Sequence, residues 1–270
     1  MAAWTGYENI VLENKMTDLM NSKLEVKGLM TIDDSLTESA GMRKTVNTYN
    51  YTGSMEELAK GAKNSSYGNV TFTPQNYDVK RYQQSFKYND MDVMKDPYTL
   101  DVAMEGAATV MGNDIRNQYF AELAKLTGAN EYKYGDAQPN TTFNYDVIVD
   151  ALAKINQEVE DGMFIIMGND LRALVRKDPE FKASRQGEIL YTGQFGTIAG
   201  VPVLFSKLVP ANTAYIATRE TVRFFVKKDG TVEQSRNVET KDNIVVYERH
   251  GLIALYDKTK AMKITKHSAP

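Results

Sequence analysis

The strongest hydrophobic pattern in the chain lies between residues 96 and 127. Asp96 is placed to cap the start of a helix there, Pro97 suits its first position, and Gly128 can end it. At ~1.5 Å per residue such a helix is ~45 Å long, much longer than an average one. Its predicted buried face consists of apolar residues that recur every three or four positions, namely Leu100, Met104, Ala107, Ala108, Met111, Ile115, Tyr119, Leu123 and Leu126.

Small residues cluster in the first half of the same helix, at Ala103, Gly106, Ala107 and Gly112. A glycine in a helix interior costs roughly 1 kcal/mol relative to alanine, so its presence needs a compensating reason. We therefore expect another backbone to approach this small face closely.

A second stretch, residues 67–94, has the pattern of extended chain. Two extended runs, Asn69–Thr73 and Tyr77–Tyr88, are separated by a Pro-Gln-Asn segment, which predicts a hairpin. Neither face of the second run is apolar enough for an ordinary core strand. The hairpin is therefore expected to lie outside the core, either in contact with another molecule or as a solvated surface loop.

The remaining chain alternates between helical and extended patterns, which together indicate an α+β protein. Apolar spacing predicts a helical segment at residues 10–24 and an extended segment at 41–51. Beyond them the pattern predicts a helix that starts at Asn144, a buried strand at 164–167 and a helix that ends at Asp178. The end of the chain is rich in predicted strands, with a hairpin turn at Asp229 and Gly230.

Composition and charge act mainly by excluding classes of function. The 270 residues carry a net charge of −3, which does not suit a protein that binds mainly through phosphate contacts. They include no cysteine, so disulfides and cysteine metal sites are excluded. No stretch is apolar for long enough to cross a membrane. Neither of the two histidines, His250 and His267, has a partner at the spacing of a metal site or a catalytic triad. No nucleotide-binding motif occurs. We therefore expect no catalytic, cofactor or metal site.

The order of these elements resembles that of the major capsid proteins of tailed bacteriophages, which share the Hong Kong ninety-seven fold. The resemblance covers nearly the whole chain. It rests on the stretch from Tyr67 to Tyr88 that leads into the long helix, and on three shorter stretches: FIIMGND at 164–170, GTIAGVPV at 196–203 and YERHG at 247–251.

The resemblance implies an α+β fold of four parts. These are an N-terminal arm (residues 1–66), an extended β-hairpin loop (67–92), a peripheral domain built on the long spine helix (93–142 and 223–244), and an α/β axial domain (143–222 and 245–270).

The resemblance also implies a function that needs no cofactor: self-assembly into pentamers and hexamers of an icosahedral virion shell around double-stranded DNA. Assembly would take place in the bacterial host cytoplasm, with a separate scaffolding protein and a portal as partners, and without membrane or sequence-specific DNA contacts. In such shells the extended loop reaches over a neighbouring subunit. The expected inter-subunit contact residues are therefore Lys80, Arg81, Tyr82, Phe86, Lys87 and Tyr88.

Two alternatives remain open at this point. An encapsulin, the shell protein of a bacterial cargo compartment, has the same fold and a similar length, and residues 10–24 loosely match its N-terminal helix. A soluble α+β enzyme is the alternative of a different class, although no catalytic motif supports it.

Overall fold

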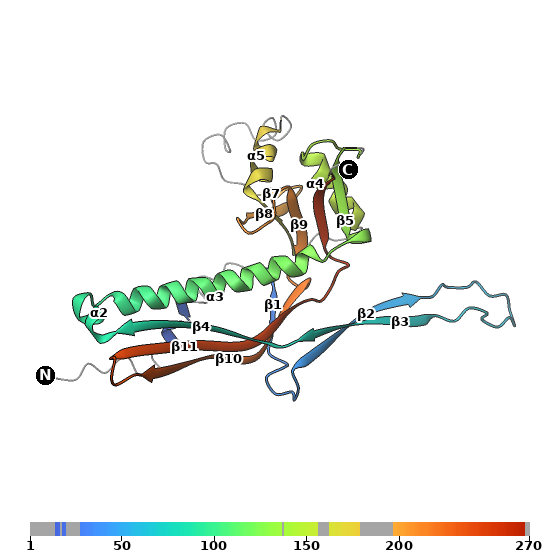
Figure 1. Cartoon of the computed structure of the whole chain (residues 1–270). Coiled ribbons are helices and arrows are strands. Elements are labelled where there is room, and N and C mark those ends of the chain that lie inside the picture. The colour runs from blue at the N-terminus through green and yellow to red at the C-terminus, as the bar shows by residue number, and fades with distance from the viewer. Residues whose placement is uncertain are drawn as a thin grey trace.

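The computed structural model describes residues 14–16, 18–19, 28–136, 138–155, 162–178 and 197–267. These residues form an elongated body, a second domain that stands on one end of it, and a two-stranded arm that projects beyond that end (Figure 1). Most of the helical segment predicted at 10–24 lies outside the described residues, although residues 14–16 and 18–19 are helical.

A four-stranded sheet and one long helix make up the body. The strand order is β1 (Thr31–Asp33), β10 (Val222–Arg236), β11 (Asp242–Leu255) and β4 (Lys80–Asn89), and only the β1–β10 pair is parallel. A short helix, α2 (Asp90–Lys95), turns the chain from β4 into α3 (Thr99–Ala124), which runs back along the sheet (Figure 1).

The predicted apolar face of α3 is confirmed, because every residue in it is buried. It packs against residues of β4, β10 and β11 in the largest hydrophobic core of the described chain. Burial of this kind stabilises a fold by ~25 cal/mol per Å² of apolar surface, so a stripe that runs the length of the helix is the main support of the body.

The predicted ends of this helix are wrong by a few residues. Asp96 follows the last residue of α2, and its side chain accepts a hydrogen bond from the backbone N–H of Tyr98, so α3 begins only at Thr99. At its other end α3 stops at Ala124, and Gly128 opens the next turn with a positive φ of 69°. The helix is therefore 26 residues and about 39 Å long.

The expected close approach at Gly106 is also wrong. Gly106 is exposed, and a Cβ atom built on it would have no neighbour within 4 Å. Ala107 and Ala108, by contrast, belong to the core. The small residues of α3 thus divide between a packed face and an open one.

The two extended runs of the predicted hairpin do not pair with each other. Strand β3 (Asn69–Asp78) pairs with β2 (Arg43–Thr52), whereas β4 pairs with β11. The chain passes straight from β3 to β4 through Val79, which is buried and donates its backbone N–H to Met42. The extended hairpin is therefore β2–β3, and the predicted loop at 67–92 combines half of this arm with a strand of the body.

Proline misled the prediction at this point. Pro74 does not interrupt β3 but stands opposite Asn47 in the two-stranded ribbon. A proline is compatible with a strand that has a free edge, because the missing N–H is not needed on that side.

The predicted hairpin turn at Asp229 and Gly230 is likewise wrong. Strand β10 continues through this position, with irregular register between Val226 and Thr231. A Cβ atom at Gly230 would come within 1.9 Å of the Tyr247 hydroxyl oxygen, so the glycine makes room for a cross-strand ring. The true turn of this hairpin is formed by residues 237–241.

The second domain is built on a six-stranded sheet. Its strand order is β5 (Glu131–Gly135), β12 (Met262–His267), β9 (Thr213–Thr218), β6 (Met163–Met167), β8 (Val201–Phe205) and β7 (Thr197–Ile198). Helices α4 (Tyr145–Ile155) and α5 (Asn169–Lys177) share a core with one face of this sheet. The other face packs on the C-terminal end of α3, where Phe120 meets Tyr215.

The two α helices of this domain follow the sequence prediction. The Asn144 side chain accepts a hydrogen bond from the backbone N–H of Val147 and so caps α4 as expected. The predicted buried strand is β6, and α5 ends before Asp178. Val159, whose spacing in the sequence continues the apolar face of this helix, lies outside the described residues.

The two sheets divide the chain at other positions than the domain boundaries implied by the resemblance, and those boundaries stay a prediction. Strand β5 was expected in the peripheral domain (93–142), but it belongs to the six-stranded sheet. The second half of β11 was expected in the axial domain (245–270), but β11 stays in the four-stranded sheet as far as Leu255. The chain therefore changes sheets near residue 128, and again near 221 and 256.

A matched pair of substitutions on α3 tests this packing. Ala107→Phe should overpack the core and lower the free energy of unfolding by roughly 1–3 kcal/mol. Gly106→Ala, one residue away on the open face, should raise it by up to ~1 kcal/mol because alanine favours the helix. Chemical denaturation of the unassembled protein measures both changes, and equal destabilisation by the two variants would contradict the assigned faces.

Candidate interaction surfaces

The six residues expected to contact a neighbouring subunit all lie on β4, inside the body rather than on the arm. Tyr82, Phe86 and Tyr88 share one face of this strand, where Tyr82 and Phe86 are half-buried and Tyr88 is buried. Arg81 and Lys87 on the other face are exposed, and so is Lys80 at the start of the strand. The three aromatic residues pack toward the core beneath α3. Burial also raises the pKa of the Tyr82 and Tyr88 hydroxyls.

Two of the three basic residues of β4 have carboxylate partners within the same chain. Arg81 lies 2.7 Å from Glu248, and Lys87 lies 2.7 Å from Asp242, both across the β4–β11 pairing. Partial burial disfavours the charged form of Glu248, but the hydrogen bond from Lys228 and the charge of Arg81 outweigh it and lower its pKa. These pairs set the register of β4 against β11 more than they stabilise the fold, because their basic ends are exposed to water.

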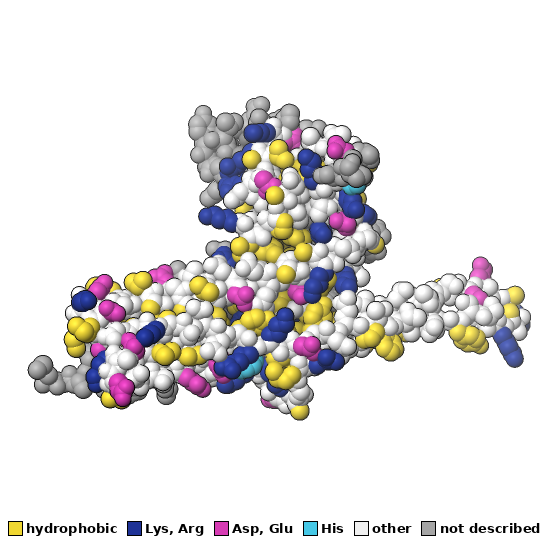
Figure 2. All heavy atoms as spheres, in the orientation of Figure 1, with side chains coloured by type: hydrophobic (Ala, Val, Ile, Leu, Met, Phe, Trp, Pro, Cys, Tyr) yellow, Lys and Arg dark blue, Asp and Glu magenta, His cyan; other side chains and the backbone are white. Residues whose placement is uncertain are grey.

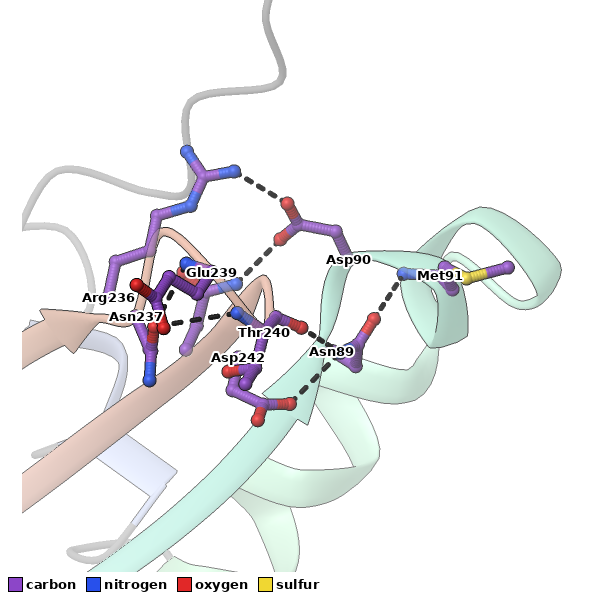
Figure 3. A network of polar contacts seen from close by, with 9 residues as sticks. Asn89, Asp90, Met91, Arg236, Asn237, Glu239, Thr240 and Asp242 are labelled. Carbon is purple, nitrogen blue, oxygen red and sulfur yellow. Dashed lines mark hydrogen bonds and ion pairs between the residues drawn. The ribbon is translucent and has the colours of Figure 1, made fainter.

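A polar clasp holds the far end of the body together (Figure 3). The Asn89 side chain accepts a hydrogen bond from the Met91 N–H, which starts α2, and its amide donates to Thr240 O and to Asp242, both at 2.9 Å. Asp90 accepts from Arg236 at 2.6 Å and from Asn243 at 2.7 Å. The clasp therefore ties the start of α2 to the β10–β11 turn.

Asp242 is the most strongly perturbed carboxylate of the clasp. Hydrogen bonds from Lys87, Asn89 and Thr240 stabilise its charged form and lower its pKa to about 2. Its position beside β4 fixes the register of three strands at the tip of the body.

The arm exposes apolar side chains on a ribbon that has little core of its own. Tyr49 and Phe72 stand opposite each other with ring centroids 6.5 Å apart, yet they are 67% and 62% exposed. Further exposed residues are Tyr51 and Val70 on the strands, and Met55, Leu58 and Tyr67 beyond them. Figure 2 shows groups of hydrophobic side chains on this projecting part of the molecule.

Sequence reasoning missed β2 as a strand of the projecting arm. Its extended pattern at residues 41–51 was recognised, but not its pairing with 69–78. The available signal was its composition, because tyrosine, threonine and asparagine alternate there without any aliphatic face beyond Val46. Apart from Val46, which is buried in a small core at the base of the arm, such a strand has no apolar face for a core to cover.

Neither a metal-binding cluster nor a membrane-spanning helix is found among the described residues. No group of three or more His, Asp or Glu side chains among them could hold a metal ion. Within the same residues, no helix combines the length and hydropathy needed to cross a membrane. The features that stand out are the exposed arm and the clasped tip at the opposite end of the body.

Comparison with known proteins gives a consistent result. The profile of a family described as phage capsid protein matches residues 72–263. The major capsid protein of Staphylococcus phage phiMR11 is 23% identical over 98% of this chain and 96% of its own length. In structure, the capsid of a native GTA particle aligns with a TM-score of 0.73 at 12% identity, covering 91% of each chain. The capsid of Cyanophage P-SCSP1u gives 0.70 at 12%, covering 89% of this chain and 87% of its own.

The lowered pKa of Asp242 predicts an acid-sensitive clasp. A carboxylate with a folded-state pKa of about 2, below its ordinary 3.8, stabilises the fold fully above pH ~4 and loses this contribution as the pH falls toward 2. Asp242→Asn should therefore flatten the decline of the melting temperature between pH 4 and 2.

The control is Glu239→Gln, which removes an exposed carboxylate from the same turn but keeps the backbone contact of residue 239. Thermal unfolding of the unassembled variants at several pH values provides the comparison. Parallel wild-type and Asp242→Asn curves would show that Asp242 does not titrate with unfolding.

Proposed function

The chain belongs to the phage capsid protein family and is a major capsid protein of the tailed-phage type, and on this premise we propose that its copies close into an icosahedral shell of pentamers and hexamers. The proposed shell encloses double-stranded DNA in the virion. The single observation that carries the assembly proposal is the β2–β3 arm, whose apolar residues are left exposed by the part of the chain that the structure describes.

The proposed partner of the arm is a second copy of the chain. An isolated two-stranded ribbon is marginally stable in water, so its exposed rings gain most by packing on another surface. Such a surface exists at the opposite end of the body, where Met94, Tyr98 and Val102 are exposed on and beside α2 and α3. The arm and the α2–α3 end lie at opposite ends of the molecule, so the arm of a subunit cannot reach the α2–α3 end of the same subunit (Figure 1). Packing of the arm on this surface therefore requires a head-to-tail contact between two subunits.

The two sheets support separate roles in this assembly. We assign the four-stranded sheet with α3 to the peripheral domain and the six-stranded sheet with α4 and α5 to the axial domain around the centre of each pentamer and hexamer. The exposed Arg81 and Lys87 then lie on the face of the peripheral sheet that points away from α3, and Lys80 lies at the start of β4. There they steer neighbouring subunits more than they stabilise them.

The remaining partners follow from the same role. A scaffolding protein and a portal are proposed as separate chains, and the packaged DNA makes no sequence-specific contacts. A net charge of −3 agrees with this, since it provides no strong general attraction for phosphates. Assembly is proposed to take place in the cytoplasm of the host bacterium, without enzymatic activity of this chain. The contents of purified particles, DNA or a cargo protein, separate this proposal from a bacterial cargo compartment.

Shortening the arm tests the proposal. Val46 and Gln75 are paired across the arm, so an Asn-Gly turn that replaces residues 47–74 closes the hairpin directly after this pair. The replacement leaves β4 and its pairing with β11 unchanged. The shortened chain should remain folded, with a melting temperature close to that of the wild type, but should form no particles in size-exclusion chromatography and electron microscopy.

A milder variant with the full arm serves as its companion. Tyr49→Thr combined with Phe72→Thr keeps β-forming residues but removes two exposed rings, and should lower the particle yield without affecting the fold. A wild-type particle yield from the shortened chain would contradict a role of the arm in assembly.

A further inference from the structure

The arm ends in a loop that is held by its own hydrogen bonds. This arm-tip loop, residues 53–68, joins β2 to β3. Residues 59–62 form a turn closed by a backbone hydrogen bond of 2.9 Å between its ends, and Gly61 has a φ of 88°, typical of a type II turn. Closer to the strands, the Glu56 carboxylate accepts hydrogen bonds from the backbone N–H and the hydroxyl of Ser65, at 2.9 and 2.6 Å. The loop therefore holds its other side chains in defined positions.

Three charged side chains of the arm-tip loop are exposed, namely Glu57, Lys60 and Lys63. None of the three has a hydrogen-bond or ion-pair partner among the described residues. Exposed apolar residues lie beside them in the sequence: Met55, Leu58 and Tyr67. Figure 2 shows both kinds of charged side chain next to hydrophobic ones at the far end of the arm. The loop thus offers two positive charges and one negative charge on a partly apolar surface.

The α2–α3 end of the body has the opposite set of exposed charges. Asp92, Lys95 and Asp96 are exposed there, which gives two negative charges and one positive charge. The backbone N–H of Asp96 donates to Asp92 O at 2.9 Å, so the two acidic residues lie one helical turn apart. Exposed apolar residues accompany this set as well: Met91, Met94 and Tyr98.

The charges of this end are not balanced within the part of the chain that the structure describes. The Asp96 carboxylate accepts only the backbone N–H of Tyr98, and no oppositely charged side chain of the described residues pairs with Asp92 or Lys95. Asp90 differs, because Arg236 lies 2.6 Å from it. Asp92, Lys95 and Asp96 are therefore available to a partner.

The mixture of charges favours a second copy of the chain over nucleic acid. A phosphate backbone attracts uniformly positive surfaces, whereas Glu57 places a negative charge between the apolar residues and the lysines of the loop. Two arm-tip loops would repel each other through Lys60 and Lys63. The α2–α3 end matches the loop in charge, sign for sign, and also in its exposed apolar residues.

We propose that the arm-tip loop of one subunit docks on the α2–α3 end of the next with Lys60 and Lys63 against Asp92 and Asp96, and Glu57 against Lys95. The inference rests on the proposed head-to-tail contact and names the residues that fix its orientation. Strands of ten residues hold the loop ~33 Å beyond the root of the arm, far enough to cross to a neighbour. Complementary charge then selects one register and rejects others, in which like charges would meet.

Exchange of charge between the two surfaces tests this pairing. The arm reversal, Lys60→Glu with Lys63→Glu, should lower the particle yield roughly tenfold or more, because like charges would then face each other. Adding Asp92→Lys and Asp96→Asn to the same chain should restore particles; asparagine keeps an acceptor for the N–H of Tyr98. Lys60→Arg with Lys63→Arg keeps the charge and should retain assembly.

A second exchange is independent of the first. Glu57→Lys and Lys95→Glu should each lower the particle yield, and their combination should restore it. Both side chains are exposed and make no contact that the fold requires, so the melting temperature of the unassembled chains should stay close to that of the wild type.

The readouts are the particle yield by sedimentation and the melting temperature of each unassembled chain, measured beside the wild type and the shortened-arm chain. Particles from the shortened-arm chain, or none from the wild type, would overturn the proposed function itself. If both behave as proposed, two results overturn only the pairing: undiminished yield from both the arm reversal and Glu57→Lys, or lost yield that neither combination restores. Restored yield in a combination supports the pairing, because a merely destabilised chain would not regain assembly from a second charge reversal.

Discussion

The contact between the buried stripe of α3 and the four-stranded sheet is the interaction on which the rest of the structure depends. It sets a helix of 26 residues against the two longest strands of the described chain, and this packing holds the body together along its length. The six-stranded sheet rests on the C-terminal end of this helix through Phe120 and Tyr215, and β4 fixes the root of the arm. Errors in this packing would therefore displace both parts that we propose to meet other subunits.

The buried cores of the molecule and its exposed apolar side chains lie in different parts of the chain. Aliphatic and aromatic side chains are gathered under α3 and under α4 and α5, while exposed rings are left on an arm with few contacts to the body. The polar clasp around Asn89 and Asp90 joins the start of α2 to the β10–β11 turn through hydrogen bonds and an ion pair. This division suits a shell, in which many modest contacts between rigid subunits sum to a stable lattice and misplaced subunits are able to leave.

The sequence predicted what periodicity and capping determine, and it failed where pairing between distant segments decides. The α3 stripe, the Asn144 cap and the buried strand β6 all follow from local spacing. The arm does not, because Asn69–Asp78 and Lys80–Asn89 form almost one extended run, and only their different partners, β2 and β11, separate arm from body. Gly230 was mistaken for a turn because the ring of Tyr247, which requires the glycine, comes from another strand. The six predicted contact residues were thus placed on a projecting loop although they line a sheet.

An electron cryomicroscopy map of the particles formed by the unmodified chain tests most directly whether the arm joins the subunits. In this map the β2–β3 arm of each subunit should cross a subunit boundary and lie on the α2–α3 end of the neighbouring body, with Tyr49 and Phe72 covered. An arm that folds back on its own subunit, or that stands in solvent within an otherwise complete shell, would contradict the claim that the exposed ribbon joins the subunits.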